Sequence, residues 1–191
     1  MLSEKFSHFL DKPLSPLAKA LPVNPNIITV LGMIITSSAG FIIPFNLFLG
    51  GIFILAGGAF DLIDGIVARV NGRVTKFGAL LDSTLDRIAD GLIFLGIVWY
   101  FFHHLDKNAI ILSFLCAIAS FLISYVRARS EGLGLSCKVG IIERPERLIL
   151  LAFACLTGFL YPVILILTIL SWITVIQRIF YAKKQIKNLP H

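Results

Sequence analysis

Acidic side chains gather in one short part of this 191-residue sequence. Asp61 and Asp64 are three residues apart, and Asp82 and Asp86 are four apart, so within helices each pair shares one face. A polar connection between the two pairs turns the chain back, so the pairs can face each other. Clustered carboxylates with no nearby His or Cys favour Mg²⁺, Mn²⁺ or Ca²⁺ over zinc. The pattern predicts a site for two divalent ions that clamp a phosphate or diphosphate during an in-line displacement.

Neighbouring residues fit such a ligand. The small Gly65 and Gly78 would let a bulky group approach the backbone, and Arg69 offers a guanidinium fork for phosphate. A simpler interpretation is that the aspartates only form ion pairs with arginines at a helix boundary. Two facing pairs favour the metal site. Asp90 is interpreted separately, either as a partner of Arg87 or as a polar residue in helix packing.

The elements that carry these residues are predicted to be membrane-spanning helices. The chain is 57% hydrophobic and 15% charged, its mean hydropathy is +0.89, and residues 20–60 contain no charged side chain. Soluble domains are about 45–50% apolar and about 25% charged, so the composition excludes a typical soluble enzyme, a disordered tail and a disulfide scaffold. A crossing needs about 20 apolar residues. We expect six spanning helices near 26–43, 47–70, 75–102, 108–130, 144–160 and 161–183.

Basic residues predict the orientation. Every lysine and arginine except Lys107 falls at the same end of the expected helices as the aspartates. The positive-inside rule places that end, both termini and the site in the cytoplasm of a cell-membrane protein. The net charge of +6 then indicates topology and anionic lipid rather than nucleic acid. Residues 1–22 are weakly amphipathic and predict an interfacial segment before a six-helix bundle over 23–185, within a single domain over 1–191.

The two aspartate pairs belong to one longer stretch: Asp61-Leu-Ile-Asp64-Gly65-Ile-Val-Ala68-Arg69, eight residues, Gly78, three residues, Asp82, three residues, Asp86. This stretch resembles the signature of the CDP-alcohol phosphotransferase family at every fixed position. The resemblance implies an all-α, six-helix, homodimeric membrane enzyme with a polar cavity open to the cytoplasm. Such an enzyme transfers the phosphatidyl or archaetidyl group of a CDP-linked lipid to an alcohol and releases CMP.

The same resemblance implies roles for individual residues. Asp61, Asp64 and Asp82 would bind Mg²⁺ or Mn²⁺, and Asp86 would share one ion and act as the general base. The CDP-lipid would contact Gly65, Arg69, Thr75, Gly78 and the start of the first helix at Pro25, Asn26, Ile27 and Ile28.

Five arginines raise the question of the acceptor alcohol. Several guanidiniums that converge beside a metal site suit a phosphorylated polyol. The sequences around them resemble the branch of the family that uses inositol 1-phosphate. Glycerol 3-phosphate remains an alternative acceptor, and a cation- or proton-coupled transporter is the alternative of another class. The candidate phosphate-binding residues are Arg127, Arg129, Arg144, Arg147 and Arg178.

Overall fold

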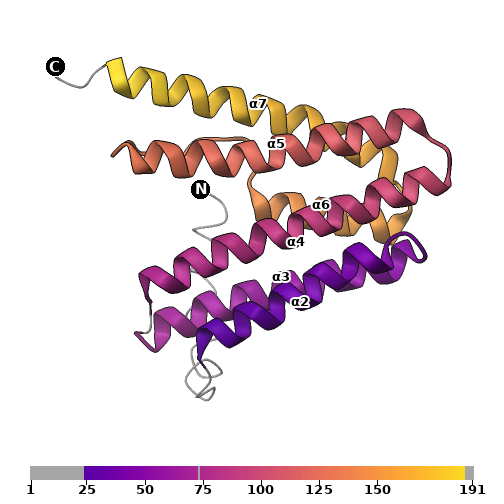
Figure 1. The fold of residues 1–191 in the computed structure, drawn as a ribbon, viewed down its shortest axis with the longest axis horizontal. Helices are drawn as coiled ribbons and strands as arrows, with labels where there is room; N and C mark the ends of the chain where they lie inside the picture. The colour runs from indigo at the N-terminus through magenta and orange to yellow at the C-terminus, as the bar shows by residue number, and fades with distance from the viewer. Residues whose placement is uncertain (1–23, 73, 188–191) are drawn as a thin grey trace.

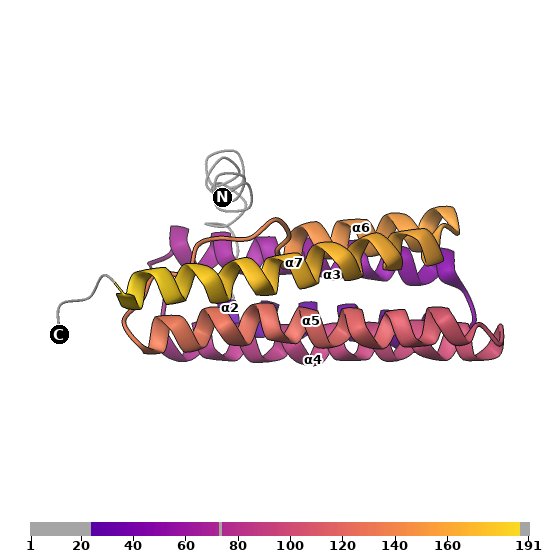
Figure 2. The same cartoon turned by 90° about the horizontal axis from the view of Figure 1, so that it is seen from above.

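The computed structural model describes residues 24–72 and 74–187, and its regular structure there is entirely helical. The helices run approximately along one long axis (Figures 1 and 2). The described part contains six helices, at the positions where six membrane-spanning helices were expected. The expected segment over 1–22 lies outside the described residues. The helices are α2 (Pro25–Ile42), α3 (Leu47–Val70), α4 (Lys76–His103), α5 (Lys107–Gly132), α6 (Arg144–Thr157) and α7 (Leu160–Lys187).

The largest departure from the expected boundaries concerns the last two helices. Helix α6 ends at Thr157 rather than near residue 160, because Gly158 adopts a left-handed conformation with φ of 78° that stops the helix. Helix α7 then begins at Leu160 and continues to Lys187, four residues beyond the expected end.

Four helices are long and apolar enough to cross a membrane: α2, α3, α5 and α7. Helix α4 is long enough to cross, with 28 residues, but its first half carries the polar side chains of Asp82, Asp86 and Arg87. Helix α6 has 14 residues, about 21 Å at 1.5 Å per residue, which is less than the ~30 Å of a bilayer core. The structure therefore supports a multi-pass membrane protein.

The helices pack in two groups. Helix α2 lies against both α3 and α4, while α5 pairs with α7, and α6 packs between the groups on α3 and α7 (Figure 1). The main apolar core extends through both groups and includes Ile54, Ile97 and Leu167, all fully buried. A smaller core of Ile28, Ile66 and Val67 lies between the start of α2 and the end of α3, next to the aspartates.

The connection between α5 and α6, residues 133–143, is irregular, yet part of it is buried. Irregular backbone at membrane depth needs hydrogen-bond partners from the protein. Three side chains of α7 supply them: Thr174, Arg178 and Gln185. The backbone groups that they bind are Ser136 N and O, Val139 O, Ile141 N and Ile142 N. Helix α7 therefore holds the connection, and with it the start of α6, against the bundle.

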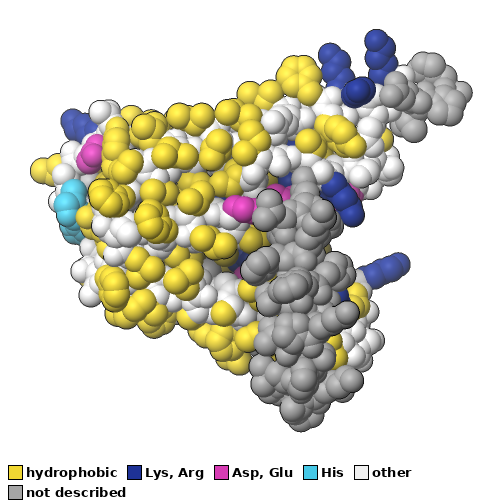
Figure 3. Space-filling model, turned by 180° about the vertical axis from the view of Figure 1, so that it is seen from behind, with side chains coloured by type: hydrophobic (Ala, Val, Ile, Leu, Met, Phe, Trp, Pro, Cys, Tyr) yellow, Lys and Arg dark blue, Asp and Glu magenta, His cyan; other side chains and the backbone are white. Residues whose placement is uncertain are grey.

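The outer surface agrees with a lipid environment. Hydrophobic side chains cover most of the face seen in Figure 3, whereas lysines and arginines gather toward the end at which α7 finishes. Large exposed apolar side chains occur on several helices, among them Phe48, Phe114 and Ile166.

We predict that Gly57→Ala destabilises the protein while Gly58→Ala does not. A Cβ atom at Gly57 would lie 1.8 Å from Oγ1 of the buried Thr36, whereas a Cβ atom at Gly58 meets nothing within 4 Å. Overpacking of this kind costs about 1–3 kcal/mol, and alanine at an open helical position is favourable by up to about 1 kcal/mol. Thermal unfolding of the two variants in detergent measures the difference; equal midpoints would show that Gly57 does not set the spacing of α2 and α3.

Candidate active site

Asp61 of α3 and Asp86 of α4 meet at the guanidinium of Arg144, the first residue of α6. Arg144 Nη1 donates to Asp61 Oδ2 at 2.6 Å and lies 2.9 Å from Asp86 Oδ1. All three side chains are mostly buried, with exposed fractions of 13–17%. The expectation that α3 and α4 bring their carboxylates together is thereby confirmed for Asp61 and Asp86.

Asp64 and Asp82 complete the acidic cluster. Asp64 is buried against Thr29 of α2, and its Oδ2 atom has no hydrogen-bond partner. Asp82 is half-buried and close enough to Asp61 and Asp64 for mutual repulsion. The four aspartates of the sequence motif therefore lie in one region, which we call the aspartate cluster: Asp61, Asp64, Asp82 and Asp86.

Helix α2 forms one wall of the aspartate cluster, which the sequence did not reveal. At Gly32 an added Cβ atom would lie 3.0 Å from Asp61 Oδ1, so glycine is what lets the carboxylate approach this helix. Thr29, one turn earlier, reaches Asp64. A glycine and a threonine in an apolar helix carry no signal that distinguishes them from ordinary packing residues.

Asp90 connects the aspartate cluster to α6. It is 3% exposed, and its two oxygens bind Arg144 Nε at 3.3 Å and Arg147 Nη2. Arg87 also lies 4.0 Å away, so the expected partner is present but is the most distant of the three. The two α6 partners were missed, although the spacing of Asp82, Asp86 and Asp90 by fours already placed all three on one face of α4.

The donor set suits a hard divalent cation, because it consists of carboxylate oxygens and includes the unpartnered Asp64 Oδ2. Within residues 24–72 and 74–187 no three acidic, His or Cys side chains stand close enough together to hold an ion. Arg144 occupies the space between Asp61 and Asp86. The residues fit a metal, provided that this guanidinium moves.

The residues expected to contact the CDP group lie at the same end of α2, α3 and α4. Thr75 caps α4 by accepting a hydrogen bond from Gly78 N at 2.9 Å, and Asn26 Oδ1 lies beside the same glycine. Gly65 faces the guanidinium of Arg69. These residues place polar atoms and open backbone where a nucleotide could bind; Ile27 is exposed, whereas Pro25 and Ile28 are buried.

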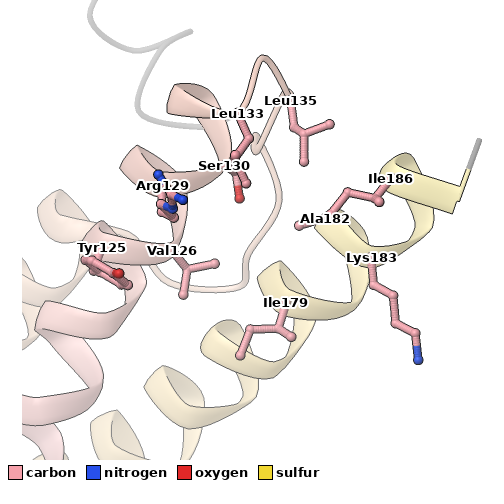
Figure 4. Close-up of a pocket in the computed structure, with 10 residues that line it drawn as sticks. All are labelled: Tyr125, Val126, Arg129, Ser130, Leu133, Leu135, Ile179, Ala182, Lys183 and Ile186. Atoms are coloured by element: carbon pink, nitrogen blue, oxygen red, sulfur yellow. The ribbon is translucent and has the colours of Figure 1, made fainter. Parts of the chain in front are cut away.

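The five candidate arginines do not form a single group. Arg144 and Arg147 lie at the aspartates. Arg127 pairs with Glu131 at 3.0 Å and lies 3.8 Å from Glu143. Arg129 is exposed and lines an apolar groove of about 340 Å³ between the ends of α5 and α7 (Figure 4).

Arg178 is the arginine whose surroundings differ most from the expectation of a polar cavity. It is 2% exposed, and its nitrogens donate to Val139 O at 2.8 Å, to Ile123 O at 2.7 Å and to Glu143 Oε1 at 2.9 Å. Glu143 in turn forms a capping box with Glu146 at the start of α6. In this arrangement Arg178 positions the helix end that presents Arg144 and Arg147, while its expected role toward a phosphate stays a prediction.

The chain is similar to known proteins over most of its length. Residues 22–180 match the family model described as CDP-alcohol phosphatidyltransferase. The archaetidylinositol phosphate synthase of Pyrococcus horikoshii is 38% identical over 183 residues, which cover 93% of this chain and 95% of the relative.

Two solved structures of the phosphatidylinositol phosphate synthase of Mycobacterium tuberculosis share the fold, each at 34% identity. The form with CDP-DAG bound gives a TM-score of 0.82 and covers 88% of this chain and 92% of that one. The form in complex with manganese and citrate gives 0.81, with coverage of 90% and 88%. These matches favour an enzyme over the transporter that the sequence left open.

We predict that Arg178→Leu destabilises the fold by about 3–5 kcal/mol, because it breaks the buried ion pair with Glu143 and removes the hydrogen bonds that Arg178 donates to Val139 O and Ile123 O. Lys183→Gln, an exposed charge removal on the same helix, is the matched control and is expected to stay within about 0.5 kcal/mol of the wild type. Chemical denaturation in detergent measures both. Wild-type stability of the leucine variant would remove the positioning role of Arg178.

Proposed function

The chain belongs to the CDP-alcohol phosphatidyltransferase family, and on that premise we propose that it transfers a phosphatidyl or archaetidyl group from a CDP-linked lipid to inositol 1-phosphate. The products are the corresponding inositol phosphate lipid and CMP. The synthases among the relatives support this acceptor, and the donor lipid is either CDP-diacylglycerol or CDP-archaeol.

One observation carries the proposal. Asp86 Oδ1 and Arg144 Nη1 lie 2.9 Å apart, so the carboxylate proposed as general base is the immediate neighbour of a guanidinium that can bind phosphate. A phosphorylated polyol held by Arg144 and Arg147 would present its hydroxyl group to Asp86. A neutral acceptor such as free inositol has no phosphate for those guanidiniums to bind.

Two ions of Mg²⁺ or Mn²⁺ would be held by the aspartate cluster, Asp61, Asp64, Asp82 and Asp86. The manganese complex of the mycobacterial relative supports a divalent ion. Bound metal would neutralise charge on the diphosphate and on the departing CMP. Asp86 takes the proton from the acceptor hydroxyl, whose oxygen then attacks the lipid-side phosphorus.

The remaining candidate residues orient the two substrates. The CDP group would bind at the end shared by α2, α3 and α4. The residues proposed for it are Gly65, Arg69, Thr75 and Gly78, together with the start of α2 at Pro25, Asn26, Ile27 and Ile28. Arg127, Arg129 and Arg178 stay proposed as further residues for the acceptor phosphate. Arg178 contributes by holding Glu143 and the start of α6.

We also propose six membrane crossings within a single domain, with the site and both termini in the cytoplasm. The charged first half of α4 would line the polar site while its second half is apolar. The short α6 would complete its crossing together with the packed connection before it, whose Leu135, Cys137 and Ile142 are buried. The basic end of the molecule supports this orientation (Figure 3). The homodimer stays a prediction from the family resemblance.

The acceptor assignment predicts CMP release only with inositol 1-phosphate. Purified protein would be incubated with CDP-diacylglycerol or CDP-archaeol and Mg²⁺ or Mn²⁺, in parallel with inositol 1-phosphate, free inositol, glycerol 3-phosphate and serine. Preference for glycerol 3-phosphate would keep the phosphotransferase chemistry but overturn the acceptor. Absence of CMP with every acceptor would overturn the proposed function.

A further prediction concerns the base. Asp86→Asn is expected to retain CDP-lipid binding and to lower kcat at least about 100-fold, because an amide cannot accept the hydroxyl proton. Asp106→Asn is the matched control: Asp106 Oδ1 caps α5 at the opposite end of the bundle by accepting from Ala109 N at 3.0 Å, and asparagine caps equally well. Turnover by Asp86→Asn at the level of this control would contradict the assignment.

A further inference from the structure

We propose that Arg144 is an internal counter-cation of the aspartate cluster and that it competes with the divalent metal for Asp61 and Asp86. The proposal rests on the proposed function, since that function requires metal at these carboxylates. It assigns to Arg144 a role beyond binding the acceptor, because it makes the loading of metal and the release of this side chain one linked event.

The contacts make the competition direct. A single atom, Arg144 Nη1, lies 2.6 Å from Asp61 Oδ2 and 2.9 Å from Asp86 Oδ1. Divalent ions bind carboxylate oxygens at about 2.0–2.6 Å, so an ion that used both of these oxygens would need the space that Nη1 holds. The two cations would also repel each other strongly at such short range in a mostly buried site.

Arg144 differs in this respect from the other arginines of the site. Arg147 contacts Asp90, and Arg87 lies 3.8 Å from Asp86 and 4.0 Å from Asp90. Arg144 instead bridges α3 and α4, because it contacts both Asp61 and Asp86. Removal of its charge therefore tests the bridge between Asp61 and Asp86, together with the contact that Arg144 Nε makes with Asp90.

Asp90 keeps Arg144 nearby when it is displaced. Arg144 Nε lies 3.3 Å from Asp90 Oδ1, on the side of the guanidinium nearer to the backbone, while the distal Nη1 binds the other two carboxylates. Asp90 is also bound by the buried Arg147, so this anchor stays in place. Displacement of Nη1 would free N–H groups of Arg144 to bind the acceptor phosphate.

The test measures Mn²⁺ binding to the full-length protein in detergent, without lipid or acceptor, by electron paramagnetic resonance. Arg144→Gln is expected to bind Mn²⁺ at least about tenfold more tightly than the wild type, because the competing cation is gone. Lys183→Gln removes one exposed positive charge at the same end of the molecule and is expected to leave the affinity unchanged. A matching gain in the control variant would overturn the proposal, since the effect would then be general.

A second variant keeps the proposal testable if Arg144→Gln does not fold. Arg144→Lys retains the charge, but its single ammonium group lacks the planar fork that bridges both carboxylates, so this variant is expected to bind Mn²⁺ more tightly than the wild type. Unchanged or weaker Mn²⁺ binding in the variants would show that Arg144 organises the carboxylates for metal rather than competing with it, which overturns the proposal.

Thermal unfolding provides an independent readout. Without metal, the glutamine variant is expected to unfold at a lower temperature than the wild type, and saturating Mn²⁺ is expected to raise its midpoint more, as linkage requires for the tighter binder. These measurements involve no turnover. If CMP release with inositol 1-phosphate failed while tighter Mn²⁺ binding was found, the proposed acceptor would be wrong and the competition would stand.

Discussion

Compensation of clustered carboxylates inside an apolar helix bundle is the constraint on which the rest of this structure depends. Asp61, Asp64 and Asp86 lie mostly or fully out of solvent on helices that are otherwise built for lipid. Isolated charges in such surroundings cost several kcal/mol, so each must have a counter-charge or a metal. Arg144 of α6 meets this requirement for Asp61 and Asp86, and it comes from a part of the chain that is more than 50 residues away, whereas Asp64 Oδ2 has no partner.

Because α6 delivers this arginine, its start must be held accurately. Glu143 caps the helix, and Arg178 binds Glu143 while also binding the carbonyl groups of Ile123 and Val139. A buried arginine in the last helix thus fixes the position of two arginines in the preceding one. The irregular connection before α6 can enter the bundle only because α7 side chains satisfy its backbone.

Close helix contacts provide the other half of the framework. Gly40 and Gly96 bring α2 and α4 together, where an added Cβ atom would lie 2.2 Å from Leu92 O or 2.1 Å from Gly40 O. Gly32 brings Asp61 against α2 in the same way. Small residues at helix interfaces allow the backbone approach that membrane bundles rely on for packing. The aspartates of α3 and α4 therefore stand in a narrow space bounded by α2 and α6, where one guanidinium or a metal can serve several of them.

The amino-acid sequence by itself determined the helices, nearly to their ends, and the local carboxylate spacing within α3 and α4. Both follow from periodicity over a few turns, which sequence records directly. The family signature, too, lies within 26 consecutive residues, from Asp61 to Asp86. Only the tertiary structure decided that Arg144 bridges Asp61 and Asp86, that Asp90 binds Arg147, and that Arg178 holds Glu143. These pairs join residues 35 to 83 positions apart, and their choice depends on how the helices pack, because several arginines on different helices could equally well have compensated the same charges.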